Sequence, residues 1–352
     1  MRVNKRPSVS IVIPTYNEED NIEAVVGGFL ASSYSNILEI LVVDGNSTDS
    51  TTAKVAELSC LYSKVKLLHN PFRIQSAALN IGLKACQGEV FLRADAHCQY
   101  ASDYIEKCIE TLLTTKASNV GGAQRFVAKD RFQAGVALAA NSLLGNGGAK
   151  YRNPQYDGYV DTVFLGCMWK NTLINVCGYS NQITNEDAEL NQRLLEKDAE
   201  AIYVSSNIKV WYYPRKTWTS LYVQYFKYGR GRFLTATKHT KNLQIRSKLP
   251  FLFISCIIMF FGLDLFLPTI NLHIERLIIL GTIAVLAESL RINLKFNGNF
   301  LKEVWRGSEK YPPSLFERWL CCAIVIMTLP VAHFSGYGYQ LFRCKVLKIS
   351  DW

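Results

Sequence analysis

The sequence predicts an α/β protein, with a mainly parallel sheet that has helices on both faces, followed by membrane helices. Three observations support this prediction. Over the first 100 residues, short apolar segments alternate with stretches of helical periodicity, which is typical of a parallel sheet. A polar turn follows each of these apolar segments directly. After residue 248, two segments of 26 and 24 residues carry at most one charge each, and both are long enough to cross a bilayer.

Four short apolar segments are the predicted strands: residues 9–13, 38–43, 65–68 and 89–92. Between them, apolar residues recur at helical spacing, for example at residues 22, 25, 26 and 29. Ser47 or Thr48 is suited to cap the second helix. The alternation of strands and helices therefore predicts a single sheet through residue 92.

Polar side chains follow these strands at their carboxyl ends, where α/β sheets bind ligands. Tyr16, Asp44 and Asp95 all fall at such ends. Asp95 and His97 lie two residues apart, so in an extended chain they share a face and can bind one metal ion. Taken alone, this pair also fits an ordinary turn.

The net charge of +10 is concentrated in one segment. Between Glu200 and Asp264 the chain has ten Lys and Arg and no acidic residue. Because a long apolar segment follows at once, lipid headgroups or a phosphorylated substrate fit this segment better than nucleic acid.

Several common classes of protein are disfavoured because their sequence motifs are missing. No G-x-G-x-x-G follows the first strand and no P-loop motif occurs, which disfavours a dinucleotide-binding dehydrogenase or a P-loop enzyme. The ten cysteines form no C-x-x-C pair, so we expect a reducing compartment rather than disulfides or structural zinc. The first apolar segment is too short for a signal peptide, so we expect the first domain to stay in the cytosol.

Three motifs occur in order: IPTYNE at residues 13–18, VVDGNSTD at 42–49 and ADAH at 94–97. Together they resemble family 2 of the glycosyltransferases, GT-A fold enzymes that invert the anomeric centre of a nucleotide-diphosphate sugar. Further motifs resemble the branch with the succinoglycan-biosynthesis transferases: VGG at 120–122, GNGGAKYR at 145–152, VDT at 160–162, NEDAEL at 185–190 and QYFKYGRGR at 224–232. The resemblance covers residues 8–245.

The resemblance implies a nucleotide pocket formed by Pro14, Tyr16, Glu18 and Asp44. Tyr16 offers a stacking face, and Asp44 can accept hydrogen bonds from a base or ribose. Arg73, before the third helix, can reach a phosphate with its fork of donors, although a surface arginine fits equally well.

Asp95 and His97 stand where the family has its D-x-D metal motif. The resemblance therefore implies that Asp95 binds the donor and that both residues hold a divalent cation, Mg²⁺ or Mn²⁺. Imidazole is a better ligand for transition ions such as Mn²⁺ than for Mg²⁺, so the histidine leaves the identity of the metal open.

The acceptor side is predicted at Glu186 and Asp187, which begin a helix with Leu190, Leu194 and Leu195 on one face. The dipole of a helix favours an ionised carboxylate in its first turn, although acidic residues there are also common caps. The resemblance places the general base at Asp187, with Glu186 beside it. The glycine-rich residues 145–152 can form a loop that closes over the donor, and a solvent-exposed loop without a role fits them equally well.

The expected domains are a GT-A catalytic domain over residues 1–245 and a membrane region over 246–352, with spans near 249–274 and 319–342 and a doubtful one near 272–290. Basic residues before 249 place that end on the cytoplasmic side. The tail is also basic, so either this rule is overridden or the last segment turns back, at Pro330 or at residues 336–338. A buried helical hairpin in a soluble protein is the alternative.

The expected function is a membrane-associated inverting glycosyltransferase at the cytoplasmic membrane, facing the cytosol. It would move a sugar from a nucleotide-diphosphate donor to a lipid-linked saccharide for a bacterial exopolysaccharide, capsule or O-antigen. A polyprenyl-phosphate sugar synthase or a processive synthase is the alternative enzyme, and Lys227 and Tyr228 in place of the Arg and Trp of Q-x-x-R-W disfavour the processive one. A catalytically inactive, nucleotide-sensing membrane scaffold is the alternative outside enzymes.

Overall fold

A computed structural model describes residues 6–146, 148–238, 245–266, 273–308, 310–349 and 352. The chain forms two compact units, which we describe separately. The first unit contains Met1–Arg125 and Lys150–Tyr212, and the second contains Phe126–Ala149 and Tyr213–Trp352. The sequence predicts a boundary at residue 245 between a catalytic domain and a membrane region. That boundary divides the chain by function, not by compactness, and it stays a prediction.

The first unit is built on one sheet with the strand order β3-β2-β1-β4-β8-β6-β9-β5, in which β7 also pairs with β9. The strands are β1 (Val9–Thr15), β2 (Ile37–Asp44), β3 (Val65–His69), β4 (Val90–Arg93), β5 (Cys98–Tyr100), β6 (Asn119–Phe126), β7 (Gly158–Tyr159), β8 (Phe164–Trp169) and β9 (Ile202–Tyr212). The four predicted strands are confirmed as β1 to β4, and they form the parallel half. The other half contains antiparallel pairs, so the sheet is mixed. The simple strand–helix alternation of the sequence ends at β4.

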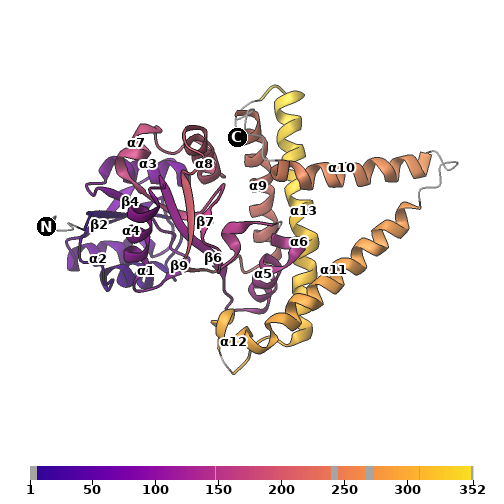
Figure 1. The fold of residues 1–352 in the computed structure, drawn as a ribbon, viewed down its shortest axis with the longest axis horizontal. Helices are drawn as coiled ribbons and strands as arrows, with labels where there is room; N and C mark the ends of the chain where they lie inside the picture. Colours follow the sequence, from indigo (N-terminus) through magenta and orange to yellow (C-terminus); the bar gives the residue numbers. More distant parts are fainter. Residues whose placement is uncertain (1–5, 147, 239–244, 267–272, 309, 350–351) are drawn as a thin grey trace. The chain divides into compact units, whose positions relative to one another are not determined.

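The helices of the first unit lie on both faces of this sheet (Figure 1). They are α1 (Ile22–Leu30), α2 (Thr51–Leu61), α3 (Gln75–Ala85), α4 (Tyr104–Thr115), the 3₁₀ turn η1 (Lys150–Arg152), α7 (Lys170–Asn175) and α8 (Glu186–Lys197). The chain runs from β1 to β3 toward one edge and then returns to place β4 on the other side of β1. Because such crossovers are right-handed, α1 and α2 cover one face and α3 the other. Ligands bind where the strand order reverses, which here is between β1 and β4.

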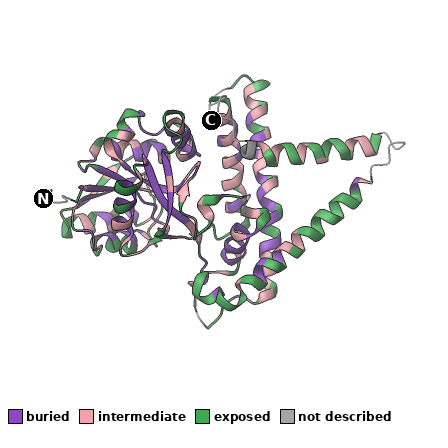
Figure 2. Cartoon of the chain, viewed as in Figure 1, coloured by how far each residue is buried: buried purple, intermediate pink, exposed green. Residues whose placement is uncertain are grey.

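Apolar side chains of the sheet form the core of the first unit, and Figure 2 shows its strands as the buried layer. Phe91, Leu41 and Val12 belong to one buried cluster with Leu79 of α3 and Leu190 of α8. Burial of a side chain of this size stabilises the fold by about 1.5–3 kcal/mol. The predicted apolar face of α1 is also buried. The periodicity of the sequence therefore identified which faces of these helices turn inward.

The second unit is helical. Its helices are α5 (Arg131–Asn141), α6 (Leu143–Asn146), α9 (Trp218–Lys238), α10 (Ile245–Phe266), α11 (Ile274–Phe296), the 3₁₀ turn η2 (Asn297–Asn299), α12 (Phe300–Glu303) and α13 (Leu315–Lys345). Helices α9 and α13 pack through glycines. A Cβ atom on Gly229 would meet the carbonyl oxygen of His333, and one on Gly336 would meet that of Phe226. The backbones lie so close that these positions need glycine.

Within the described residues, three helices are long and apolar enough to cross a membrane: Lys248–Phe266, Ile274–Glu303 and Leu315–Lys345. They include the two predicted spans, although residues 267–272 lie outside the described residues. The third predicted span, near residues 272–290, corresponds to α11, which continues as a helix through the charged residues Glu288 and Arg291. No part of the most apolar stretch of α10 is buried, whereas 44% of the corresponding stretch of α13 is buried (Figure 2).

The structure can be compared with two predictions, one for the last apolar segment and one for residues 145–152. Helix α13 is continuous past Pro330 and through residues 336–338, so of the two alternatives for the last segment, the one in which it turns back at either point is wrong. The segment 145–152, expected to be a closing loop, contains the end of α6 and the turn η1. Residue 147 lies outside the described residues, and closure over the donor stays a prediction.

Candidate active site

The turn after β2 is built around Asp44, which is buried. Its two carboxylate oxygens accept hydrogen bonds from the backbone N–H and the hydroxyl of Ser47. Asp44 also lies opposite Thr15 of β1 in the parallel register, and Gly45 N–H donates to the Thr15 carbonyl at 2.9 Å. The polar turns after β1 and β2 therefore form one surface, as their positions in the sequence predicted.

The predicted cap of α2 is wrong. The helix begins at Thr51, and its N-cap is Ser50, whose side chain makes no capping hydrogen bond. The Ser47 hydroxyl is instead used by Asp44, and the Thr48 N–H donates to the side chain of Asn17. These residues join the two turns rather than closing the helix.

The other predicted donor residues lie around the same strand ends. Pro14 lies opposite Val43 in the register of β1 and β2. Tyr16 is 53% exposed, so its ring is accessible for stacking. Arg73 is exposed and lies two residues before α3 begins, with a left-handed backbone at φ 58°. The structure thus brings Tyr16 near Asp44 through the paired strands, while the roles of all three residues stay predictions.

At the end of β4, Asp95 is held from two sides. Its Oδ1 atom accepts hydrogen bonds from Arg93 Nε at 3.2 Å and from Gln75 Nε2 of α3 at 3.4 Å. Its backbone N–H donates to the Tyr100 hydroxyl at 2.7 Å, and that hydroxyl donates to the Asp95 carbonyl oxygen. The Asp95 carboxylate is therefore placed by strand, helix and turn together.

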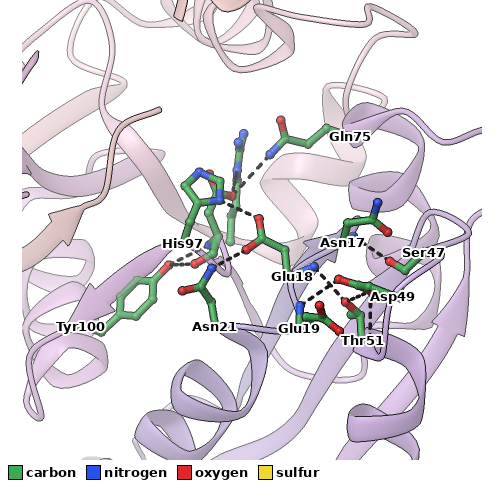
Figure 3. A network of polar contacts seen from close by, with 12 residues as sticks. Asn17, Glu18, Glu19, Asn21, Ser47, Asp49, Thr51, Gln75, His97 and Tyr100 are labelled. Atoms are coloured by element: carbon green, nitrogen blue, oxygen red, sulfur yellow. Dashed lines mark hydrogen bonds and ion pairs between the residues drawn. The ribbon is translucent and has the colours of Figure 1, made fainter. Parts of the chain in front are cut away.

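His97 lies two residues further on and contacts the turn that follows β1. Its Nδ1 atom lies 3.0 Å from Glu18 Oε1 (Figure 3). The His97 ring also meets the ring of Tyr212 edge-on, with centroids 5.3 Å apart. Glu18 and His97, 79 positions apart in the chain, thus meet beyond the carboxyl ends of β1 and β4, the two strands at which the strand order reverses.

Glu186 and Asp187 begin α8, as predicted, with Leu190 and Leu194 buried along its inner face. Glu186 is buried and its Oε1 atom accepts a hydrogen bond from Arg93 Nη1 at 3.1 Å. Asp187 is half-buried and accepts the Ala188 N–H at 2.7 Å. Arg93 therefore connects the end of β4 to the start of α8.

For Glu186 the pKa shift runs against the expected effect of the helix dipole, which favours ionised carboxylates in the first turn. Burial raises the pKa of Glu186 to about 7, the Arg93 guanidinium opposes this, and Asp187 adds to it. A buried carboxylate loses more hydration than the dipole returns. The raised pKa brings Glu186 closer to protonation than an exposed glutamate at the same pH.

The segment before α8 is fixed to α3. Ser76 Oγ donates to the carbonyl of Gln182 at 2.9 Å. Asn80 donates to the carbonyl of Tyr179 at 2.8 Å and accepts the Tyr179 N–H at 2.9 Å. Helix α3 therefore supports both Asp95, through Gln75, and the segment leading to Asp187.

The donor set around Asp95 and His97 fits a divalent cation bound together with a diphosphate. Within the described residues, no three His, Cys, Asp or Glu side chains group as metal ligands, so the protein would supply fewer than three. Asp95 Oδ2 makes no hydrogen bond within the described part of the chain, and the Nε2 atom of His97 is not the nitrogen bound to Glu18. One carboxylate and one imidazole leave the remaining positions for phosphate oxygens and water.

Arg93 and Gln75 are site residues that the sequence interpretation left without a role. Arg93 ends an apolar strand and is buried. A charged residue in such a segment is almost never buried without a partner, and this signal pointed to a buried acidic group. Its second partner, Glu186, is 93 positions away, and only the folded chain identifies it.

Comparisons with known proteins agree with this geometry. Residues 10–172 match the family described as Glycosyl transferase family 2. The succinoglycan biosynthesis protein ExoA of Rhizobium meliloti is 36% identical over 243 residues, which cover 68% of this chain and 73% of that protein. A Methanococcus voltae enzyme, dolichyl N-acetyl-α-D-glucosaminyl phosphate 3-β-D-2,3-diacetamido-2,3-dideoxy-β-D-glucuronosyltransferase, is 28% identical over 280 residues, covering 76% and 86%.

The fold also matches a solved structure, the mannosyltransferase PcManGT from Pyrobaculum calidifontis in complex with GDP-Man and Mn²⁺. The TM-score is 0.54 at 16% identity, over 93% of this chain and 87% of that one. This similarity concerns the fold alone. With the family match and the extended similarity to ExoA, it leads to one conclusion: the chain belongs to family 2 of the glycosyltransferases and has the GT-A fold.

Proposed function

We propose that this glycosyltransferase moves one sugar from a nucleotide-diphosphate donor to a saccharide carried on a membrane lipid, with inversion at the anomeric carbon. UDP is the nucleotide to test first. One observation carries the proposal: Arg93 bonds both to Asp95 at the end of β4 and to Glu186 at the start of α8. The residues expected to handle the donor therefore lie beside those expected to handle the acceptor.

The donor would lie over the ends of β1, β2 and β4. The exposed ring of Tyr16 is available to stack on the base, next to Pro14 and the turn closed by Asp44. Arg73 can bind a phosphate by its fork of donors. Asp95 and His97 would hold a divalent cation, Mg²⁺ or Mn²⁺, which neutralises the charge that develops on the departing diphosphate.

Asp187 would act as the general base. Its carboxylate takes the proton of an acceptor hydroxyl as that oxygen attacks the anomeric carbon. The new carbon–oxygen bond forms on the face opposite the diphosphate while the bond to the diphosphate breaks, which inverts the configuration. Glu186 is buried and paired with Arg93, which suits it to hold Asp187 in place rather than to take the proton.

Four observations support a lipid-linked acceptor and a site on the cytosolic side of the bacterial inner membrane. The described part of the chain has three helices long and apolar enough to cross a membrane, and the ten basic residues between Glu200 and Asp264 suit an anionic surface. ExoA is named for succinoglycan biosynthesis, and the name of the M. voltae enzyme describes a sugar linked to dolichyl phosphate. An exopolysaccharide, capsule or O-antigen is the product class that fits.

The test uses the full chain in detergent micelles, a panel of labelled nucleotide sugars and lipid-linked saccharides extracted from membranes. We expect one sugar added per acceptor, activity lost with EDTA and restored by Mn²⁺ or Mg²⁺, and an inverted linkage in the product. Sugar joined directly to polyprenyl phosphate, or long polymer, would point to the alternative enzymes. No turnover with any donor would contradict the proposal and favour a nucleotide-sensing scaffold.

Replacing Asp187 with asparagine tests the assigned base. The variant keeps the size and most hydrogen bonds of the side chain but cannot accept the proton, so transfer should fall by at least 10²-fold. Donor binding, measured by calorimetry with the nucleoside diphosphate and Mn²⁺, should stay unchanged. Full transfer activity in Asp187→Asn would remove this residue from the role.

A further inference from the structure

We infer that Glu18 is a positioning residue for His97: it fixes the imidazole so that Nε2 is the nitrogen left to bind the divalent cation. This inference rests on the proposed function, because that function supplies the cation. It gives Glu18 a different role from the nucleotide contact that the family resemblance implies. The contact between Glu18 and His97 is visible at the centre of the polar network in Figure 3.

Glu18 is fixed at three points. Its Oε1 atom lies 3.0 Å from His97 Nδ1, and its Oε2 atom accepts a hydrogen bond from Asn21 Nδ2 at 2.9 Å. Its backbone N–H donates to Thr51 Oγ1 at 2.8 Å. Its side chain is 18% exposed. Both carboxylate oxygens are therefore engaged, and the side chain is held toward His97.

The hydrogen-bonding chemistry of the pair selects one form of the imidazole. A carboxylate only accepts hydrogen bonds, so the contact requires that Nδ1 of His97 carries the hydrogen. In the neutral ring the lone pair is then on Nε2, the atom that can ligate a metal. A carboxylate behind a ligating histidine also raises the basicity of the ring and fixes its orientation.

This arrangement explains how a histidine can serve where the family has a second aspartate. An imidazole has one lone pair and must be oriented, whereas a carboxylate can offer either oxygen. His97 is also flanked by the Tyr212 ring at 5.3 Å, so Glu18 and Tyr212 together restrict rotation of the imidazole. The network around Glu18 thus prepares the ring before a cation arrives.

The experiment measures Mn²⁺ bound to the full chain in detergent micelles with excess UDP, and repeats it with GDP. Free Mn²⁺ is counted by electron paramagnetic resonance, and pulsed spectra detect the ¹⁴N coupling of a ligating imidazole. We expect a ¹⁴N coupling in the wild-type protein and none in His97→Ala. In Glu18→Ala we expect Mn²⁺ affinity to fall 10–100-fold, with the ¹⁴N coupling weakened or lost.

Further variants separate positioning from general damage. Glu18→Gln can still accept from Nδ1 through its amide oxygen and should lose less affinity than Glu18→Ala. In a His97→Ala background, Glu18→Ala should cause no further loss. Glu19→Ala is the matched control, because Glu19 lies in the same turn but accepts its hydrogen bond from the Ser50 N–H, and it should bind Mn²⁺ as the wild type does.

The possible failures are distinguishable. Mn²⁺ binding in the wild type without a ¹⁴N coupling would overturn the inference and leave the proposed function standing. A Glu18→Ala variant with unchanged affinity and coupling would overturn it as well, and so would a further loss of affinity in the His97→Ala background, which would indicate a direct role of Glu18 at the nucleotide or metal. A wild-type protein that binds no Mn²⁺ would overturn both the inference and the metal part of the proposed function.

Discussion

Replacing Arg93 with methionine should destabilise the first unit and should do so in a pH-dependent way. The Arg93 side chain is 7% exposed and pairs with Asp95 at 3.2 Å and Glu186 at 3.1 Å, which are 10% and 5% exposed. Methionine fills a similar volume but leaves two buried carboxylates without a cation. Breaking a buried pair in this way costs about 3–5 kcal/mol.

The effect should shrink as the pH falls, because burial raises the pKa of Glu186 and its protonation removes one of the two uncompensated charges. Hydrogen–deuterium exchange of peptides from β1 and β4 reports the opening free energy of the first unit alone. It should be compared at pH 5 and pH 8 in the full chain. The expected result is a loss of about 3–5 kcal/mol at pH 8 and a clearly smaller loss at pH 5.

Arg125→Met is the matched control. Arg125 also belongs to the first unit, but it donates to backbone carbonyl oxygens, those of Ala123, Pro154, Ser206 and Ile208. Its loss leaves no buried acid, so its cost should not change between the two pH values. A loss below about 1 kcal/mol in Arg93→Met, or one that does not depend on pH, would refute the reasoning.

Two further predictions concern the start of α8 and the packing of α13. Because burial raises the pKa of Glu186 from its ordinary 4.5 to about 7, the folded state binds this proton more tightly. The contribution of Glu186 to the free energy of unfolding is therefore complete below pH 4.5 and is lost as the pH rises through 7, by at most about 3 kcal/mol. Hydrogen–deuterium exchange measured from pH 4.5 to 8 should show this decrease in opening free energy in the wild type and not in Glu186→Gln. Gly336→Ala should lower the thermal midpoint of the chain in detergent, since the new Cβ atom would meet the Phe226 carbonyl. Gly338→Ala in the same helix is the control and should leave the midpoint unchanged, because its Cβ atom would meet only a Phe251 ring carbon at 3.6 Å. Equal midpoints for the two variants would contradict this prediction.

The sequence by itself determined the parallel half of the sheet, the inward faces of α1 and α8, and the motifs that identify the family. These features are local: strand and helix periodicity depend on neighbours a few positions apart. Polar residues such as Asp44 and Asp95 could also be placed, because carboxyl ends of parallel strands meet at one edge. The caps and ends of elements were less predictable, as Ser47 shows, since a hydroxyl can serve a turn or a helix equally well.

Only the tertiary structure decided which distant residues meet. The pairing of Arg93 with Glu186, and of Glu18 with His97, joins residues 93 and 79 positions apart, and neither pair leaves a periodic trace in the sequence. The raised pKa of Glu186 was also decided there, because it comes mainly from the loss of hydration when the side chain is buried. The antiparallel half of the sheet depends in the same way on strands that pair across long connections, which local patterns do not encode.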